Sequence, residues 1–430
     1  MHAISTSTGA TGAARGAGIA RLKRVQLAAV TSGHLVNDVY AAFLTPLLPL
    51  IVAKFDMSLA MAGLLAAVYA TTSSLVQPVV GHLADTSGSR AFIVLGPAVT
   101  ASAMCMIGLA GSQALLVGLL VIGGIGSGMF HPQGAAMAGS IDESRKGFIL
   151  SAFTTAGEIG YALGPLVVLS VVSTLGLGHT YLTILPGLLV AVFIYRYAPP
   201  APARARRFPR GVEGRCGRGG RDRGGGDYEN ARRDGSGRAP VGALGMLWII
   251  AAVRLCVTMG FTTFLPLYLK GMGLPLVAYG SVASLFMFAG TVGIMVAGPL
   301  ADRVGPFRLM MVALIAPIPL FLAFLNTTGL ISYAFLAVAG VIVYAPMPVI
   351  TMTAQNLAPA RAGTVSAFMM GVAWGAGSLG VAGVGVMADA IGIRMALTLL
   401  LGALVVAATL AYALERQVGR GPALAAVQAA

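Results

Sequence analysis

One short stretch of this sequence occurs twice, first as Gly81-His-Leu-Ala-Asp85-Thr-Ser-Gly88-Ser-Arg90 and then as Gly298-Pro-Leu-Ala-Asp302-Arg303-Val-Gly305-Pro-Phe-Arg308. The copies start 217 residues apart, and the same offset relates Gly63 to Gly280. In each copy an acidic residue has a glycine four positions before it and another three positions after it, which is typical of a tight turn. A turn duplicated in matching places predicts a protein of two related halves.

Both copies end apolar runs in a chain that has the composition of a membrane protein. Apolar residues make up 57% of it, charged residues 10%, and its mean hydropathy is +0.86, whereas soluble domains are about 25% charged. A membrane-spanning helix needs about 20 mostly apolar residues. Such runs lie at 25–53, 59–83, 91–110, 114–138, 147–174, 177–198, 243–269, 276–300, 307–325, 330–355, 362–389 and 393–414. The sequence predicts an all-α membrane protein with twelve transmembrane helices in two pseudo-symmetric six-helix halves, as in transporters that rock one half against the other.

A long polar gap separates the sixth run from the seventh. Its Gly/Arg-rich part, Arg215-Cys-Gly-Arg-Gly-Gly-Arg-Asp-Arg-Gly-Gly-Gly226, has little to bury, which predicts a disordered linker. RNA binding by such a segment and translation from a shifted reading frame are alternatives, and we expect a solvated cytoplasmic linker. The predicted order is a disordered tail, a first half, the linker, a second half and a second tail, at 1–24, 25–198, 199–242, 243–414 and 415–430.

The basic residues lie mostly on one side of the predicted membrane. Of 28 Lys and Arg, three (Lys54, Lys270 and Arg394) fall in or beside loops of one parity and Arg254 falls inside a run, which leaves 24 in the tails and the loops of opposite parity. Excess Lys and Arg marks the cytoplasmic side, so both termini are predicted to be cytoplasmic. The net charge of +14 is therefore explained by topology. We expect no nucleic-acid partner, and contact with anionic lipid headgroups is secondary.

Few ionisable side chains fall inside the predicted spans. Each is a candidate for function, because a charged group is costly in a membrane and usually faces a cavity. These candidates are His34, Asp38, His131, Glu158 and Arg254. The spans that carry them belong to both halves, and we expect these side chains to face a cavity.

Asp38 is the first candidate for proton coupling. His34 lies four residues before it and so shares its helix face. A carboxyl group in a low-dielectric setting favours its neutral form, and a nearby cation favours the charged form. A proton-coupled carrier needs that competition. The alternative is a structural carboxylate paired with a helix of the same half.

Glu158 and His131 are further candidates for proton coupling. Glu158 lies between Gly157 and Gly160, where neighbouring helices can approach closely, so a fixed hydrogen bond to a neighbour is an equal alternative. His131 is of a residue type that exchanges protons near neutral pH. Pro132 beside it kinks a helix, so a purely geometric role for the pair is the alternative.

Arg254 is the candidate for substrate contact in the second half. Its guanidinium is a fixed fork of donors that suits a carboxylate, phosphate or phosphonate group. The alternative is a charge pair with Asp38 or Glu158 that closes the cavity. Further candidates for substrate contact are Asn37, Tyr40 and Tyr161.

The duplicated stretch resembles the signature that follows the second and eighth spans of the major facilitator superfamily. Within that superfamily, Gly33-His34-Leu-Val-Asn37-Asp38-Val-Tyr40, Phe130-His131-Pro132 and Gly157-Glu-Ile-Gly160-Tyr-Ala-Leu-Gly164-Pro165 are similar to the fosmidomycin resistance transporters, a bacterial efflux branch. The chain departs from the pattern at Thr86, where a basic residue is usual, and at Gln133, where an acidic residue is expected.

The resemblance covers residues 25–414 except the linker. It implies a monomeric, proton-coupled secondary transporter of the bacterial inner membrane, an antiporter that exports a small drug-like or anionic compound and gives antibiotic resistance. Its partners would be that compound, protons and membrane lipid. The resemblance also implies that the repeated turns gate transport, and a tight turn capped by Asp is the simpler interpretation. The gating candidates are Gly81, Asp85, Gly88, Arg90, Gly298, Asp302, Arg303, Gly305 and Arg308.

Two other kinds of function stay open. Uptake of a small organic anion or metabolite together with protons is favoured by Arg254, whereas the antiporter-like run Gly160-x-x-x-Gly164-Pro165 opposes it. A membrane sensor or membrane-embedded enzyme would need a signalling domain or a catalytic set, and neither stands out. We therefore expect no enzyme and no cofactor. Because the cysteines are far apart and show no metal-ligand spacing, we also expect no disulfide and no metal. The cysteines are Cys105, Cys216 and Cys256.

Overall fold

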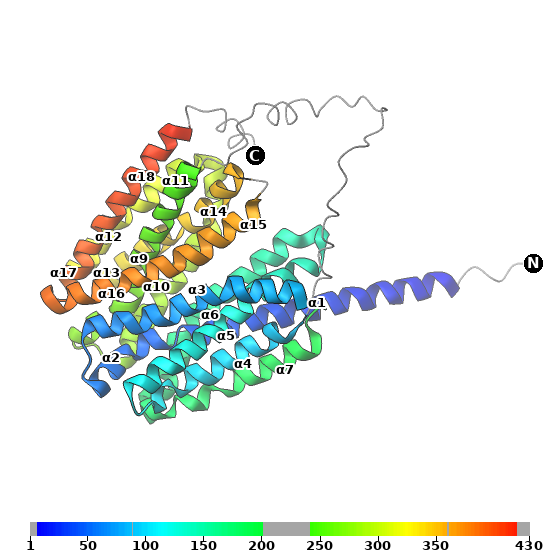
Figure 1. Cartoon of the computed structure of the whole chain (residues 1–430), viewed down its shortest axis with the longest axis horizontal. Helices are drawn as coiled ribbons and strands as arrows, with labels where there is room; N and C mark the ends of the chain where they lie inside the picture. The colour runs from blue at the N-terminus through cyan, green and yellow to red at the C-terminus, as the bar shows by residue number, and fades with distance from the viewer. Residues whose placement is uncertain (1–6, 88, 201–240, 359–360, 419–430) are drawn as a thin grey trace, which may run out of the picture.

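The computed structural model of the chain describes residues 7–87, 89–200, 241–358 and 361–418, which form a bundle of helices (Figure 1). The described part holds 12 helical segments long and apolar enough to cross a membrane, and it contains no strand. The predicted all-α membrane fold is confirmed. These segments are Gly18–Phe55, Leu59–Ala84, Ala91–Leu109, Gln113–Ser140, Glu143–Leu175, Leu177–Tyr197, Val241–Gly271, Leu276–Val304, Pro306–Asn326, Leu330–Leu357, Thr364–Ile391 and Ile393–Val418.

Several spans consist of more than one helix. In the N-terminal half the helices are α1 (Ser7–Ala41), α2 (Leu44–Phe55), α3 (Leu59–Ser87), α4 (Ala91–Met106), α5 (Gln113–Ser140), α6 (Lys146–Leu175) and α7 (Leu185–Tyr197). In the C-terminal half they are α9 (Val241–Gly271), α10 (Leu276–Val304), α11 (Pro306–Ile315), α12 (Pro317–Asn326), α13 (Leu330–Tyr344), α14 (Pro346–Leu357), α15 (Ala362–Ala367), α16 (Ala373–Ile391), α17 (Ile393–Leu400) and α18 (Gly402–Val418). Pro317 and Pro346 each begin the second piece of a broken span, because proline lacks the N–H that a continuous helix needs.

The duplication seen in the sequence is preserved to the residue in the helices that carry it. Both α3 and α10 have 29 residues, and both their first and their last residues are 217 positions apart. The second copy of the turn needs its glycine, since Gly305 follows α10 with φ of 89°, a left-handed conformation that favours glycine. The length of the apolar runs and the turn residues that follow them therefore predicted this pair of helices.

The tails and the linker differ in part from the expected organisation. Helix α1 begins at Ser7, so residues 7–24, which the sequence predicts to be disordered, are helical. Helix α18 continues to Val418, beyond the predicted end of the last span. The predictions for 201–240 and 419–430 fall outside the residues that the structure describes.

The two halves touch at one end of the bundle. We call the end where α1 begins and α18 ends the tail face, and the opposite end the far face. On the far face, Gly63 of α3 packs on the Val381 carbonyl of α16, where a Cβ would come within 2.7 Å, and Gly385 packs equally closely on Leu59. Nearer the tail face, Gly371 has no neighbour within 4 Å of a Cβ position. The helices of the two halves accordingly diverge from the far face toward the tail face (Figure 1).

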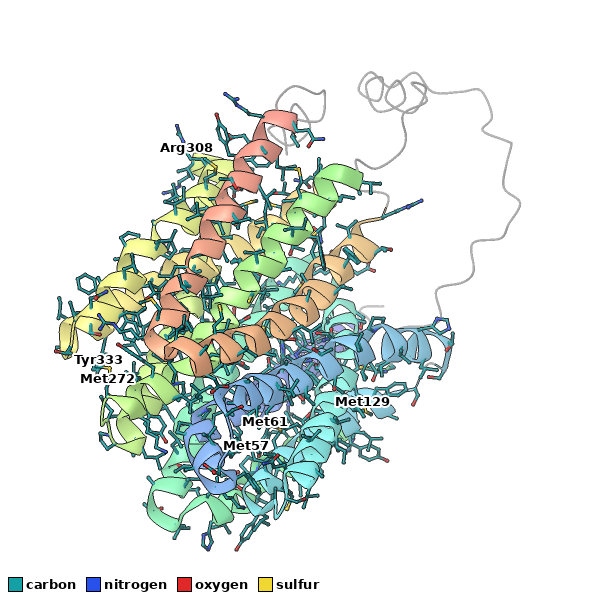
Figure 2. All side chains as sticks on the ribbon, turned by 60° about the vertical axis from the view of Figure 1, so that its left-hand side comes forward. Met57, Met61, Met129, Met272, Arg308 and Tyr333 are labelled. Atoms are coloured by element: carbon teal, nitrogen blue, oxygen red, sulfur yellow. The ribbon has the colours of Figure 1, made fainter. Side chains whose placement is uncertain are left out.

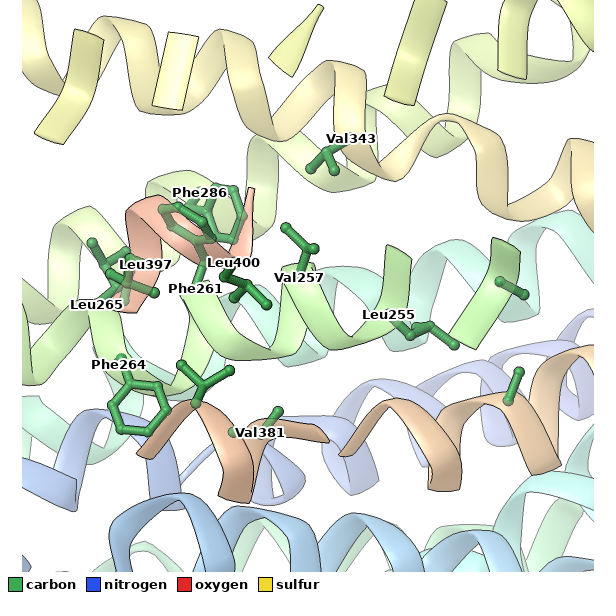
Figure 3. Packing of buried hydrophobic residues seen from close by; sticks show 14 of the residues in the cluster. Leu255, Val257, Phe261, Phe264, Leu265, Phe286, Val343, Val381, Leu397 and Leu400 are labelled. Atoms are coloured by element: carbon green, nitrogen blue, oxygen red, sulfur yellow. The ribbon is translucent and has the colours of Figure 1, made fainter. Parts of the chain in front are cut away.

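Each half has an apolar interior built around one central helix. In the C-terminal half that helix is α9, and Phe261 on it stacks on Phe321 with ring centroids 4.0 Å apart. Figure 3 shows Phe261, Phe264 and Leu265 of α9 among side chains of neighbouring helices. Figure 2 shows side chains along the whole bundle, with Arg308 and Met272 at opposite ends of the C-terminal half. This packing fixes α9, and with it Arg254, relative to the rest of its half.

Candidate functional site

Asp38 on α1 is held between two histidine rings. His34 Nε2 lies 3.3 Å from Asp38 Oδ2, and His131 Nε2 lies 3.3 Å from Asp38 Oδ1. His34 is one turn earlier on the same helix, as the spacing predicts, whereas His131 comes from α5. The His34 and Asp38 side chains are 9% and 14% exposed, and that of His131 is 29% exposed. The structure thus joins three separately predicted residues into one cluster, and His131 is its most accessible member.

The outer nitrogens of both rings are bonded to backbone carbonyls. His34 Nδ1 lies 2.7 Å from the Phe153 carbonyl oxygen, and His131 Nδ1 lies 2.7 Å from that of Ser127. A carbonyl only accepts hydrogen bonds, so each Nδ1 carries the hydrogen in this network. Each Nε2 that faces Asp38 then has a proton only if its ring is positively charged. The cluster therefore brings three lone-pair-bearing groups together, and their contacts depend on added protons.

A second layer of side chains orients Asp38. Asn37 donates from Nδ2 to Asp38 Oδ1 at 2.9 Å, and Thr100 of α4 donates to Asn37 Oδ1 at 3.0 Å. Asn37 is fully buried inside its own half. It was predicted to contact substrate, but here it positions the carboxylate, and its place in the sequence next to Asp38 is the only signal for that role.

Helix α6 contributes the wall behind His34. The Phe153 ring stacks on His34 with centroids 4.1 Å apart. A Cβ at Gly157 would overlap the His34 ring, so glycine is required for this approach. The close helix contact expected around Gly157 is therefore present, and its partner is the histidine. Sequence reasoning missed Phe153, whose contact with His34 depends on tertiary packing.

Tyr40 lies away from the space between the halves. It is 1% exposed, and its hydroxyl donates to the Thr183 carbonyl at 2.6 Å and accepts from the Gly187 N–H at 2.9 Å. These bonds fasten α1 to the start of α7. The structure thus places Tyr40 in the interior of the N-terminal half, in contrast to the predicted substrate contact.

Arg254 is a buried cation with few partners. It is 2% exposed, its Nη1 donates weakly to the Val343 carbonyl at 3.5 Å, and its Nε has no hydrogen-bond partner. Among the described residues it forms no ion pair. Glu158 of the other half and Tyr344 of α13 lie near enough to act on its charge. The predicted charge pair with Asp38 is absent here, because Asp38 is engaged by the histidines.

Glu158 and Tyr161 of α6 and Tyr344 of α13 are further polar side chains, contributed by both halves. The phenol of Tyr161 lies within the electrostatic range of Tyr344 and Glu158, which links α6 with α13. Glu158 itself forms no ion pair in the described part of the chain. Tyr344 was not among the candidates for substrate contact from the sequence. Glu158 is an acid of the N-terminal half, and it lies within electrostatic range of Arg254, a cation of the C-terminal half.

The cluster at Asp38 also has the shape of a metal site. His34, Asp38 and His131 each offer one ligand atom, and these atoms all lie within 4.8 Å of one another. The sequence indicated no metal ligands, because the three residues lie on two helices and show no characteristic spacing. Protons and a divalent cation would satisfy the same atoms, so a functional test must include a chelator.

The first repeated turn is tied to its own half. Arg90 donates from Nη2 to the carbonyls of Ile194 and Tyr195, both at 3.2 Å, and so caps the end of α7. Gln133 accepts from the Ile93 N–H at 2.6 Å and donates to the Ser89 carbonyl. A carboxylate could not make the second bond, which explains why an amide suits this position in this chain.

The gating candidates themselves are not in contact with the opposite half where the structure describes them. Asp302, Arg303 and Arg308 are exposed at the tail face. A Cβ atom at Gly81 would contact only Pro132, and a Cβ atom at Gly298 would have no neighbour within 4 Å. Gly88 and the side chain of Asp85 lie outside the described part. Their gating role therefore stays a prediction.

Comparison with known protein families identifies the superfamily of this chain. The Major Facilitator Superfamily profile matches residues 30–382. The chain belongs to the major facilitator superfamily. As a member of this superfamily it is a multi-pass membrane transporter, and the predicted family and span count are confirmed.

Three similar proteins show how this superfamily member compares. The fosmidomycin resistance protein of Escherichia coli K12 is 26% identical over 84% of this chain and 86% of its own length. The probable sulfoacetate transporter SauU of Cupriavidus necator H16 is 24% identical over 60% of this chain and 59% of its own. A bacterial homolog of the human lysosomal transporter Spinster, in an inward-facing and occupied conformation, has a TM-score of 0.72 at 18% identity, covering 91% of this chain and 96% of that one.

Proposed function

We propose that this superfamily member is a proton-coupled secondary transporter of the bacterial inner membrane that exports a small anionic or drug-like compound in exchange for protons. The observation that carries the proposal is the capture of Asp38 between His34 and His131, with further polar side chains contributed by both halves. The 24 basic residues of the tails and of one set of loops support the assignment of the tail face to the cytoplasmic side of the membrane. The contact at the far face then corresponds to an inward-facing carrier.

The proton step follows from the bonding of the two rings. When both rings are charged, each Nε2–H points at an oxygen of the Asp38 carboxylate, and both contacts attract. When His131 loses its proton, a nitrogen lone pair faces that oxygen and the contact repels. His131 lies beside Pro132 on α5, where the helix is already weakened. Proton release therefore loosens α5 from α1 inside the N-terminal half.

Arg254 supplies the proposed substrate contact. A buried charge is costly unless it is paired and hydrogen-bonded, and Arg254 Nε has no partner. An anionic group placed between the halves would accept from the free face of the guanidinium. The export direction is supported by the fosmidomycin resistance relative and by the Gly160-x-x-x-Gly164-Pro165 run.

Uptake of an organic anion together with protons is the second candidate function. Glu158 favours it, because a charged Glu158 competes with the anion for Arg254 and a protonated Glu158 leaves Arg254 free. Proton and anion would then bind together, as symport requires. The probable sulfoacetate transporter among the relatives also supports this candidate.

Flux into and out of proteoliposomes tests both candidates. The purified protein is given a pH gradient of either sign, with fosmidomycin, sulfoacetate and an uncharged solute as test compounds, and with a chelator present throughout. Antiport predicts that an anionic compound moves against the direction of proton flow, and symport predicts movement with it. Flux that persists unchanged after a protonophore collapses the gradient, or in the Asp38→Asn variant, would reject proton coupling at this cluster.

A further inference from the structure

The far face carries a contact between the halves that the transport site does not explain. Asp389 lies in the last turn of α16, in the C-terminal half. Its Oδ1 accepts from the Leu59 N–H and its Oδ2 from the Ala60 N–H, each at 2.8 Å. Leu59 and Ala60 open α3, in the N-terminal half. Nearby, Lys270 of α9 donates to the Pro49 carbonyl of α2 at 2.8 Å.

The start of α3 depends on this carboxylate. A helix leaves its first four N–H groups without partners inside the helix. In α3, the N–H groups of Met61 and Ala62 bond to the Oγ and the carbonyl of Ser58, at 3.2 and 3.1 Å. The other two, of Leu59 and Ala60, bond to Asp389. Two of these four N–H groups therefore receive their hydrogen bonds from the opposite half of the protein.

The position of Asp389 is unfavourable for its own helix. The C-terminal end of a helix carries partial negative charge, and the N-terminal end carries partial positive charge. Asp389 sits at the negative end of α16 and touches the positive end of α3. Its carboxylate is therefore stabilised by the partner half and not by the helix that bears it.

The contact between the halves that the repeat relates to this one has no capping carboxylate in the described part of the chain. By the repeat, α10 corresponds to α3, and it packs on α6. There Leu169 of α6 meets Gly280 of α10, and the residue before α10 is Pro275, which offers no side-chain cap. In the described part of the chain, a carboxylate caps the start of α3 but not the start of α10. The duplication alone does not require Asp389.

We propose that Asp389 is the latch of the gate at the far face. Its two hydrogen bonds hold the inward-facing arrangement, and both must break before α16 can part from α3. Gly63 and Gly385 bring the two backbones close enough for the carboxylate to reach the helix start. This role rests on the proposed alternation between inward-facing and outward-facing states. It assigns to one residue a specific share of the stability of the inward-facing state.

The latch is tested by the access of a thiol reagent to the space behind it. The reporter is a cysteine in place of Thr71, which bonds to Ser378 across the same interface at 3.0 Å, in a parent protein whose native cysteines are serine. A membrane-impermeant maleimide is applied to the far face. We expect Asp389→Asn to raise the labelling rate roughly three- to tenfold, as the loss of one hydrogen bond and a charge would do.

The matched control is Asp56→Asn. Asp56 is an exposed acid on the same face, just before α3, and asparagine tolerates its left-handed φ of 49°. A labelling rate in Asp389→Asn equal to that of Asp56→Asn, with both variants monodisperse and equally thermostable, would overturn the proposal. The assay requires no substrate and no pH gradient. A result against the latch can therefore be distinguished from a result against the proposed transport reaction.

Discussion

At the scale of single residues, His131 offers the sharpest test of the proton site. Glutamine places an amide N–H near the position of Nε2 and cannot release it. We expect His131→Gln to keep substrate exchange between equal solutions but to lose gradient-driven flux by at least about tenfold, since a positioned proton-transfer group commonly contributes that much or more. Both fluxes are measured in the same proteoliposomes.

The control for this variant is His179→Gln, because His179 is an exposed histidine at the far face. It should behave as the parent protein does in both assays. Gradient-driven flux in His131→Gln that equals the parent value would show that this ring carries no exchanged proton. Loss of both fluxes together would indicate damage to the carrier and would also contradict the proposal.

Arg254→Lys separates charge from shape at the proposed substrate contact. Lysine keeps the positive charge but lacks the planar fork that engages two anionic oxygens at once. We expect affinity for the transported anion to fall about tenfold, as loss of a charge-assisted hydrogen bond predicts, with little change in thermostability. Binding is measured by titration in detergent. An unchanged affinity would remove Arg254 from the substrate site.

At the scale of helices, Gly157→Ala probes the contact of α6 with α1. A methyl group there overlaps the His34 ring, so we expect a loss of about 1–3 kcal/mol from overpacking together with weaker proton coupling. Gly118→Ala is the matched control, since Gly118 is also helical and has no neighbour within 4 Å. Thermal unfolding in detergent gives both values. Equal melting temperatures for the two variants would contradict the close approach of α6 to His34.

Lys23 in the first half of α1 is tied to the loop before α6 by one ion pair at the tail face. Lys23 Nζ lies 2.8 Å from Asp142 Oδ2, and this hydrogen bond lowers the pKa of Asp142 from its ordinary value to about 2. Because the folded pKa is lowered, the pair stabilises the fold above pH about 4 and loses that effect as the pH falls toward about 2. The stabilisation should be constant between about pH 5 and 7.

Thermal unfolding of Asp142→Asn across this pH range checks the sign. We expect the variant to melt below the parent protein at about pH 5 to 7, and the difference to shrink only in strongly acidic buffer. Glu143→Gln, a neighbouring exposed acid, serves as control and should match the parent. A difference that grows as the pH falls would contradict the assignment.

Some of this architecture is readable from the sequence because the signals are local. Apolar length locates the spans, and the repeated glycine–acid turn locates α3 and α10. The contact of His131 with Asp38 is different, because it depends on how α5 packs on α1. The same holds for Tyr40, which resembles a cavity residue in the sequence but is bonded to the segment before α7. Residue type thus indicated the candidates, and packing decided which of them meet.

At the scale of the whole molecule, the candidate charged side chains inside the spans are divided between the two halves by sign. The N-terminal half holds the acids Asp38 and Glu158, and the C-terminal half holds Arg254. On the proposed function, the N-terminal half would carry the proton chemistry and the C-terminal half would recognise the anion. A carrier divided in this way can change its cargo through one half while the driving ion stays with the other.

The carboxylate of Asp389 has a consequence for where an idle carrier waits. A freshly doubled gene would encode two equal contacts between its halves on each face, because the halves are related by an axis along the membrane normal. With the role proposed for it, Asp389 strengthens one of the two contacts at the far face, so the empty protein would spend more of its time in the inward-facing state. For the export proposed above, that is the state in which the compound would be collected from the cytosol.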